Sequence, residues 1–150
     1  MKHPRRLSLL FFIGVFMAGS TALGYYYYFV YEPPLAAAES FMRAMERHDA
    51  AALKRLVIVT PDPEPTRLRA PKETEIADLL KNPFHRGRIL DQHKRTGATR
   101  EFDYLVYREP DGSIYALLVT QVGKDYRVVI PERHSNPKTP YLWDYNWTTQ

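Results

Sequence analysis

The segment from Leu7 to Tyr31 constrains this chain more than any other part, because its 25 residues include no charged side chain. As a helix rising about 1.5 Å per residue, the segment reaches roughly 37 Å, enough to cross a hydrocarbon core of about 30 Å. Lys2, Arg5 and Arg6 precede it, and such positive flanks are retained in the cytoplasm. The sequence therefore predicts that residues 1–31 form a cytoplasmic tip and a single transmembrane helix in the cell (inner) membrane. The C-terminal domain is then expected on the extracytoplasmic, periplasmic side.

The same segment has features of a cleaved secretory signal, because small residues surround Ser20 after an apolar stretch. The apolar run continues past this point through the aromatic block at residues 25–31, which favours retention as an anchor in the lipid bilayer. Gly14, Ala18 and Ala22 fall four residues apart and predict a smooth face on which a second membrane helix can pack.

The charge of the chain is unevenly distributed. Its formal net charge is +4, and residues 1–31 hold three of the 21 basic residues and none of the 17 acidic ones. The remainder is therefore nearly neutral, whereas nucleic-acid binders concentrate positive charge in the folded domain. The absence of cysteine excludes disulfides, thiolate metal sites and a cysteine nucleophile. We expect no nucleic-acid partner, no metal and no cofactor.

Beyond the anchor, apolar residues at helical spacing predict amphipathic helix over residues 35–57, with a break at His48-Asp49. Pro33-Pro34 is expected to end the membrane helix and to begin the next one. The proline-rich stretch 60–66 predicts a loop, and a short helix is expected between Pro71 and Asn82-Pro83.

The second half of the chain has the sequence pattern of β-strands. Turn signals such as Pro110-Asp-Gly separate alternating segments, which predict a meander of antiparallel strands with helices against one face. The expected strands are residues 88–93, 101–108, 113–121 and 126–130. The prediction is thus an α+β fold with a domain over residues 32–131 and an aromatic tail over residues 132–150.

Two stretches carry a resemblance to a known family. Residues 37–53 look like its opening helices, and residues 97–112 with 126–130 look like its terminal hairpins. The order of elements resembles the nuclear transport factor 2-like (NTF2-like, cystatin-like) superfamily. The resemblance implies a curved sheet wrapped round helices into a cone. It also implies three classes of function: isomerases and dehydratases, ligand pockets, and anchored extracytoplasmic domains of bacterial assemblies.

Candidate catalytic groups are sparse. Asp91 and His93 share a strand face and could act as a general base or as two metal ligands, but no third ligand has matching spacing. Asp103 and Tyr104 are neighbours on a strand and point to opposite faces. Tyr107 has no evident catalytic partner. A solvated strand edge is the simpler interpretation of Asp91 and His93, and we expect no enzymatic activity.

A basic cluster and the aromatic tail are the candidate binding features. Residues 81–100 carry an excess of Lys and Arg, including Arg86 and Arg88, which predicts either a solvated face or a contact with anionic headgroups or an acidic partner. The tail concentrates large side chains typical of interface hot spots, which are expected on a partner or on the protein's own sheet. These tail residues are Tyr141, Leu142, Trp143, Tyr145 and Trp147.

The function expected from the sequence is that of a non-catalytic, single-pass accessory or assembly subunit of a membrane protein complex. It would act by protein–protein interaction through its extracytoplasmic domain. The alternative is a protein that binds a small apolar ligand in the cone, in a cavity lined by Phe102, Tyr104, Ile114 and Leu118.

Overall fold

The computed structural model describes residues 4–61, 67–81, 84–96 and 100–132, with side chains from Phe11 onward except that of Arg95. The chain divides into two compact units, residues 1–33 and residues 34–150. The predicted tail, including Tyr141, Trp143, Tyr145 and Trp147, lies outside the described residues, as does most of the proline-rich loop.

The first unit is helical. Helix α1 (Pro4–Tyr26) is followed directly by a π-helical turn, η1 (Tyr27–Tyr31), in which the N–H of Glu32 donates to the carbonyl of Tyr27. The prediction that Pro33-Pro34 ends the first helix is wrong, because the helical chain continues directly into α2 (Glu32–Glu46). The prediction that the prolines begin the next helix is confirmed, since both occupy the first turn of α2, where a missing N–H is tolerated, and the wider π-turn precedes them.

The apolar side chains described on α1 are exposed, including Phe12 and Phe16, and no atom lies within 4 Å of a Cβ placed on Gly14. Ala18 and Ala22 lie on the same helix. Among the described residues, no helix has both the length and the apolarity required to cross a bilayer. The predicted transmembrane helix is therefore not confirmed.

Two helices open the second unit as predicted. The buried side of α2 includes Phe41, Met42 and Met45, and α3 (Ala50–Leu56) follows a tight turn. Asp49 caps α3 by accepting the N–H of Ala52 at 2.9 Å. The predicted break at residues 48–49 is confirmed, and His48 makes the turn with a positive φ of 53°.

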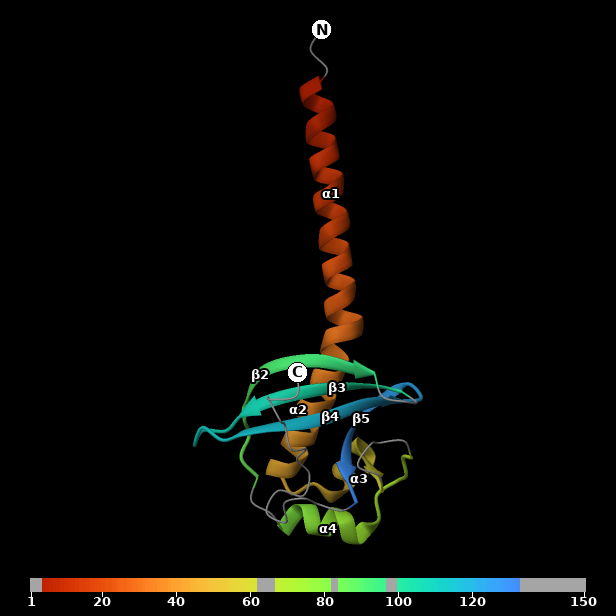
Figure 1. Ribbon diagram of the computed structural model, residues 1–150, viewed down its shortest axis with the longest axis vertical. Coiled ribbons are helices and arrows are strands. Elements are labelled where there is room, and N and C mark those ends of the chain that lie inside the picture. Colours follow the sequence, from red (N-terminus) through yellow and green to blue (C-terminus); the bar gives the residue numbers. More distant parts are fainter. Residues whose placement is uncertain (1–3, 62–66, 82–83, 97–99, 133–150) are drawn as a thin grey trace. The chain divides into compact units, whose positions relative to one another are not determined.

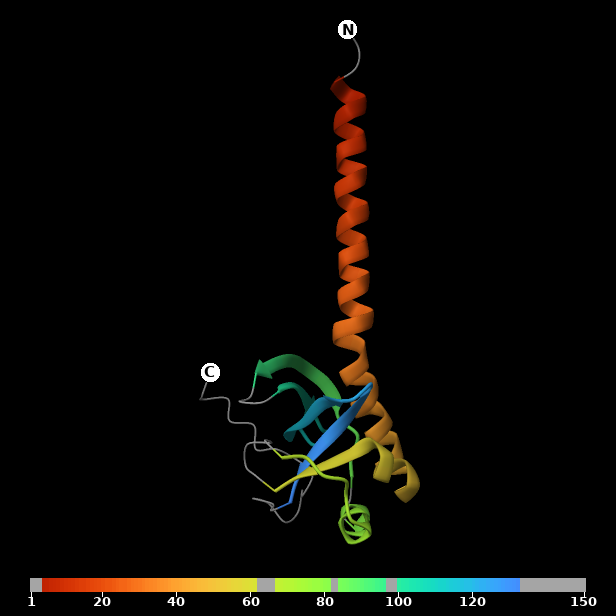
Figure 2. The same ribbon diagram turned by 90° about the vertical axis from the view of Figure 1, so that its right-hand side faces the viewer.

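The sheet has the order β1-β5-β4-β3-β2 (Figure 1). The bounds of the strands are β1 Val57–Thr60, β2 Arg88–Thr96, β3 Glu101–Arg108, β4 Ile114–Val122 and β5 Asp125–Pro131. Strands β2 to β5 form the predicted antiparallel meander, in which β2 bends along its length (Figure 2). The sheet is nevertheless mixed, because β1 pairs in parallel with β5. The expectation that the helix extends to residue 57 is wrong, since the chain enters β1 there.

Both faces of the sheet are apolar. The larger core joins the helices to residues such as Leu105, Leu117 and Val119. The smaller core lies on the other face, where Phe102 and Leu118 pack with Ile58 and Val129. The sequence predicts that Leu118 is buried and faces the helices. Its burial is confirmed, but the predicted face is wrong, because its side chain belongs to the smaller core.

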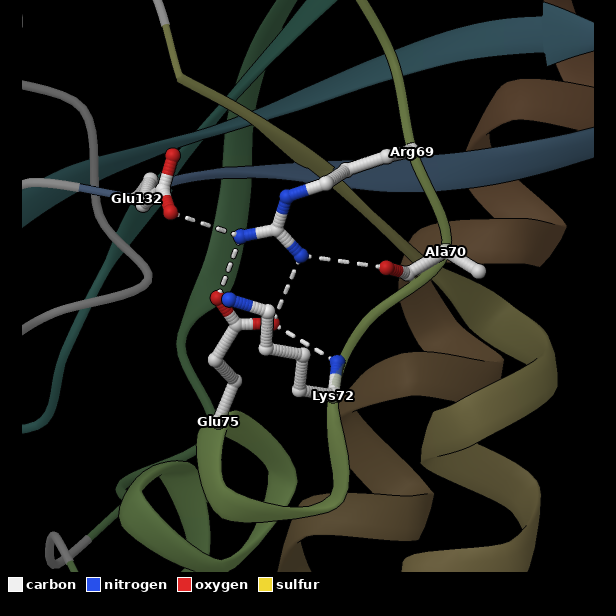
Figure 3. Close-up of polar contacts among 5 residues, drawn as sticks. All are labelled: Arg69, Ala70, Lys72, Glu75 and Glu132. Atoms are coloured by element: carbon white, nitrogen blue, oxygen red, sulfur yellow. Dashed lines mark hydrogen bonds and ion pairs between the residues drawn. The ribbon is translucent and has the colours of Figure 1, made fainter.

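Helix α4 (Glu73–Lys81) confirms the predicted short helix and lies at one end of the domain (Figure 1). A cluster around Arg69 connects it to two strands (Figure 3). The Arg69 guanidinium binds both carboxylate oxygens of Glu75, at 2.5 and 3.0 Å, and a carboxylate oxygen of Glu132 at 3.0 Å. The backbone of Arg69 also exchanges two hydrogen bonds with Val59 of β1. The Arg69 cluster therefore ties α4, β1 and the end of β5 together.

Candidate functional site

The strongest candidate site is an open cavity of about 540 Å³ beside the start of β2 and the end of β3, here called the basic groove. Three arginines surround apolar side chains in this groove. Its lining residues are Arg86, Arg88, Ile89, Leu90, Arg108, Glu109 and Pro110.

The register of the sheet creates the groove. Arg88 of β2 lies directly opposite Arg108 of β3, which places two like charges side by side. Ile89 pairs with Tyr107 and Asp91 pairs with the adjacent Val106, so Leu90 is an extra residue in β2. This bulge leaves Leu90 41% exposed. Directly opposed like charges weaken a strand pair, and bulges commonly redirect side chains at binding sites, so the arrangement is costly unless something binds there.

Few acidic groups neutralise the groove. Arg86 approaches the Glu39 carboxylate at 3.8 Å across two half-exposed side chains. Arg88 and Arg108 make no ion pair with any described residue. Glu109 is the one acidic residue in the lining of the groove. Partial burial raises the pKa of its carboxyl, because burial disfavours the charged form. The groove thus presents a positive surface to solvent.

Gly87 fixes the backbone between two of these arginines. Its N–H donates to the phenolic oxygen of Tyr115 at 3.0 Å, and this hydroxyl in turn donates to the sulfur of Met42 at 3.6 Å. Burial raises the pKa of Tyr115 to about 12, so the phenol stays protonated and can serve both bonds at neutral pH.

A second candidate, here called the polar pocket, is a cavity of about 290 Å³ at the other end of the meander. It is lined by Lys94, Arg100, Glu101, Asp103, Thr120, Gln121 and Tyr126. Asp103 is only 3% exposed. Burial raises the pKa of its carboxyl, while the Lys94 charge and a hydrogen bond from Gln92 oppose that rise.

The other catalytic candidates are not brought together. Nδ1 of His93 lies 3.6 Å from a carboxylate oxygen of the exposed Asp91, and its ring stacks on Tyr104. Asp103 belongs to the opposite face, since it pairs with Lys94 rather than His93. Tyr107 stacks on Tyr115 within the larger core. Within the described residues, no three His, Cys, Asp or Glu side chains are grouped to hold a metal.

The side chains predicted to line an apolar cavity lie on one face but differ in burial. Phe102 and Leu118 contact the smaller core, whereas Ile114 is 42% exposed near the end of β4. Tyr104 packs against the edge of that core. Phe102, Leu118 and Tyr104 therefore belong to one packed cluster, of which Ile114 is not a member.

Sequence reasoning identified Arg86 and Arg88 but missed Arg108, which the strand register brings to them. The signal available in the sequence was the Pro110-Asp-Gly turn, which fixes where β3 ends. Comparison of the chain with protein-family models, curated proteins and solved structures finds no match.

Proposed function

We propose that this protein is a non-catalytic, membrane-attached accessory subunit whose α+β domain binds an acidic segment of a partner protein in the basic groove. The single observation that carries this proposal is the set of three arginines around one groove, two of them without an ionic partner among the described residues.

The chemistry of the groove fits a carboxylate-bearing chain. A guanidinium binds carboxylates through two parallel hydrogen bonds, and Arg is enriched at interface hot spots. Ile89 and the exposed Leu90 follow Arg88 along β2 and add apolar surface to the lining of the groove. A segment that alternates acidic and apolar side chains satisfies both parts of the groove.

The proposed attachment to the bilayer rests on the N-terminal segment. Its 25 uncharged residues follow three basic ones, and the apolar side chains described on α1 are exposed. The proposed orientation places Lys2 in the cytoplasm and the α+β domain outside it. An amine reagent confined to the cytoplasm is then expected to label Lys2 and to spare Lys124 and Lys138. Labelling of the latter two in intact cells would reverse the orientation.

The binding role is tested by charge reversal. The full chain is purified in mild detergent as the parent, as Arg88→Glu and as Lys124→Glu, and the co-purifying proteins are identified. Lys124 is an exposed lysine in the β4–β5 turn and gives the same charge change away from the groove. We expect Arg88→Glu to lose a partner that Lys124→Glu retains.

Direct binding gives the complementary measurement. A fluorescent peptide of alternating Glu and Leu is titrated into each variant, and vesicles containing phosphatidylglycerol are tested in parallel. We expect Arg88→Glu to weaken peptide binding about tenfold or more. If peptide binding is unchanged and only vesicle binding falls, the groove recognises lipid headgroups and the protein-partner proposal is wrong.

A further inference from the structure

The polar pocket contains a buried acceptor that the chain does not use. Asp103 projects from the middle of β3 on the face shared with the helices, because it pairs with Lys94 on one side and with Val119 on the other. Among the described residues of the domain, Asp103 is the one buried residue with a carboxyl or basic side chain. Oδ1 of Asp103 is buried and makes no hydrogen bond to any described residue.

The same cavity contains a buried hydrogen-bond donor that also lacks a partner. Arg100 lies directly before β3, and its Nε is buried without a hydrogen-bond acceptor among the described residues. A buried polar group without a hydrogen-bond partner destabilises the folded chain. One acceptor and one donor in one cavity therefore form a complementary pair of unsatisfied sites.

Several other polar groups of the pocket have partners within the protein. The hydroxyl of Thr120 donates to the carbonyl of Glu101 at 2.9 Å. The ammonium of Lys94 lies 3.8 Å from the Glu101 carboxylate. These contacts hold the walls of the pocket in place and leave Asp103 and Arg100 to face a ligand.

We propose that the polar pocket binds a small zwitterion of the α-amino acid class, with its ammonium group on Asp103 and its carboxylate on Arg100. The site is separate from the basic groove, so this inference stands independently of the proposed partner binding.

The balance of charge in the pocket favours a zwitterion over other small ligands. The lining contains two cations, Lys94 and Arg100, and two carboxylates, Glu101 and Asp103. A simple amine would leave Nε of Arg100 without an acceptor, and a simple anion would be repelled by the carboxylate of Asp103. A divalent metal ion would meet both cations. Burial raises the pKa of Asp103 despite the nearby Lys94, and a ligand ammonium group at Oδ1 would favour the ionised carboxylate.

The experiment is calorimetric titration of the full chain with each of the twenty common L-amino acids, with ethylamine and acetate as single-charge probes. We expect at least one amino acid to bind with a Kd below about 1 mM, and both single-charge probes to bind at least tenfold more weakly. Asp103→Asn and Arg100→Gln are each expected to weaken that binding about tenfold or more.

Asp91→Asn is the matched control, because it removes an exposed carboxylate from the neighbouring strand and leaves the pocket intact. Thermal melts of all variants establish that they are folded, and Arg100→Gln tests the site independently if Asp103→Asn is altered in structure. The proposal is overturned if no amino acid binds, if ethylamine or acetate binds as tightly, or if both pocket variants bind like the parent.

Discussion

Gly87 lies so close to Tyr115 that a Cβ at this position would be 2.9 Å from the phenolic oxygen. The same atom would be 2.9 Å from Cβ of Tyr107 and 3.0 Å from the carbonyl oxygen of Arg108. Two of these three neighbours belong to the backbone or to the rigid base of a side chain. The close approach thus requires glycine between Arg86 and Arg88, and it couples the basic groove to the larger core.

Gly87→Ala is therefore expected to reduce the free energy of unfolding by about 1–3 kcal/mol, the usual range for overpacking. Urea denaturation of the full chain measures the change. Gly24→Ala is the control, since a Cβ there meets no atom within 4 Å. A Gly87→Ala variant as stable as the parent would show that the approach to Tyr115 is looser than described.

The smaller core gives a second prediction. Leu118 is fully buried between β3 and β5, where it pairs with Tyr104 and Val129. Leu118→Asp places an unpaired carboxylate there and is expected to cost several kcal/mol, detected as a large drop in melting temperature. Ile114→Asp is the control on the same strand and face, because Ile114 is exposed. Equal melting temperatures for the two variants would contradict the assigned register of β4.

Removal of the Arg69 side chain is the third prediction. The side chains of Arg69 and Glu75 are 30% and 22% exposed, so their ion pair is partly shielded from water. Arg69→Ala leaves two carboxylates without their cation and is expected to cost about 1.5–3 kcal/mol. Lys54→Ala breaks the much more exposed pair with Glu73 and is expected to change stability less than Arg69→Ala in the same denaturation experiment.

The fourth prediction concerns pH. The pKa of Asp103 is raised in the folded state, so the unfolded chain loses this proton first as pH increases. The contribution of Asp103 to stability therefore falls from about pH 3.9, the ordinary value for Asp, up to its folded pKa, and stays low above it. Asp103→Asn is expected to be more stable than the parent at neutral pH. The measurement is the free energy of unfolding of the parent and of Asp103→Asn as a function of pH. If the two proteins show the same pH dependence, the raised pKa of Asp103 is wrong.

Local patterns in the sequence are sufficient for much of this fold. Proline and glycine set the ends of α4 and the turns of the meander, where Gly112 and Gly123 adopt positive φ values of 92° and 67°. The strand β1 was missed because Val57-Ile-Val continues the apolar spacing of the preceding helix. Its partner, Val128, is remote in sequence, and only the folded chain brings the two together.

The candidate sites, too, depend partly on local sequence patterns and partly on contacts between residues remote in sequence. The excess of basic residues around Arg86 and Arg88 is visible in the sequence, but the position of Arg108 depends on strand register. The face of Leu118 was misjudged because both faces of β4 are apolar, so alternation does not distinguish them. Asp103 was considered as a candidate, but its burial arises from neighbouring strands and has no local signal.

The parallel pairing of β1 with β5 has a consequence for how the chain is made. Among the described strands, β5 is the last to leave the ribosome, and it takes an interior place between β1 and β4. Until residues 125–131 have emerged, β1 has no neighbouring strand and β4 keeps an open edge, and such edges are prone to pair with other chains. The domain therefore cannot assemble stepwise from its N-terminus. A nascent chain halted before Asp125 is therefore expected to expose the edges of β1 and β4 and to aggregate more readily than the full chain.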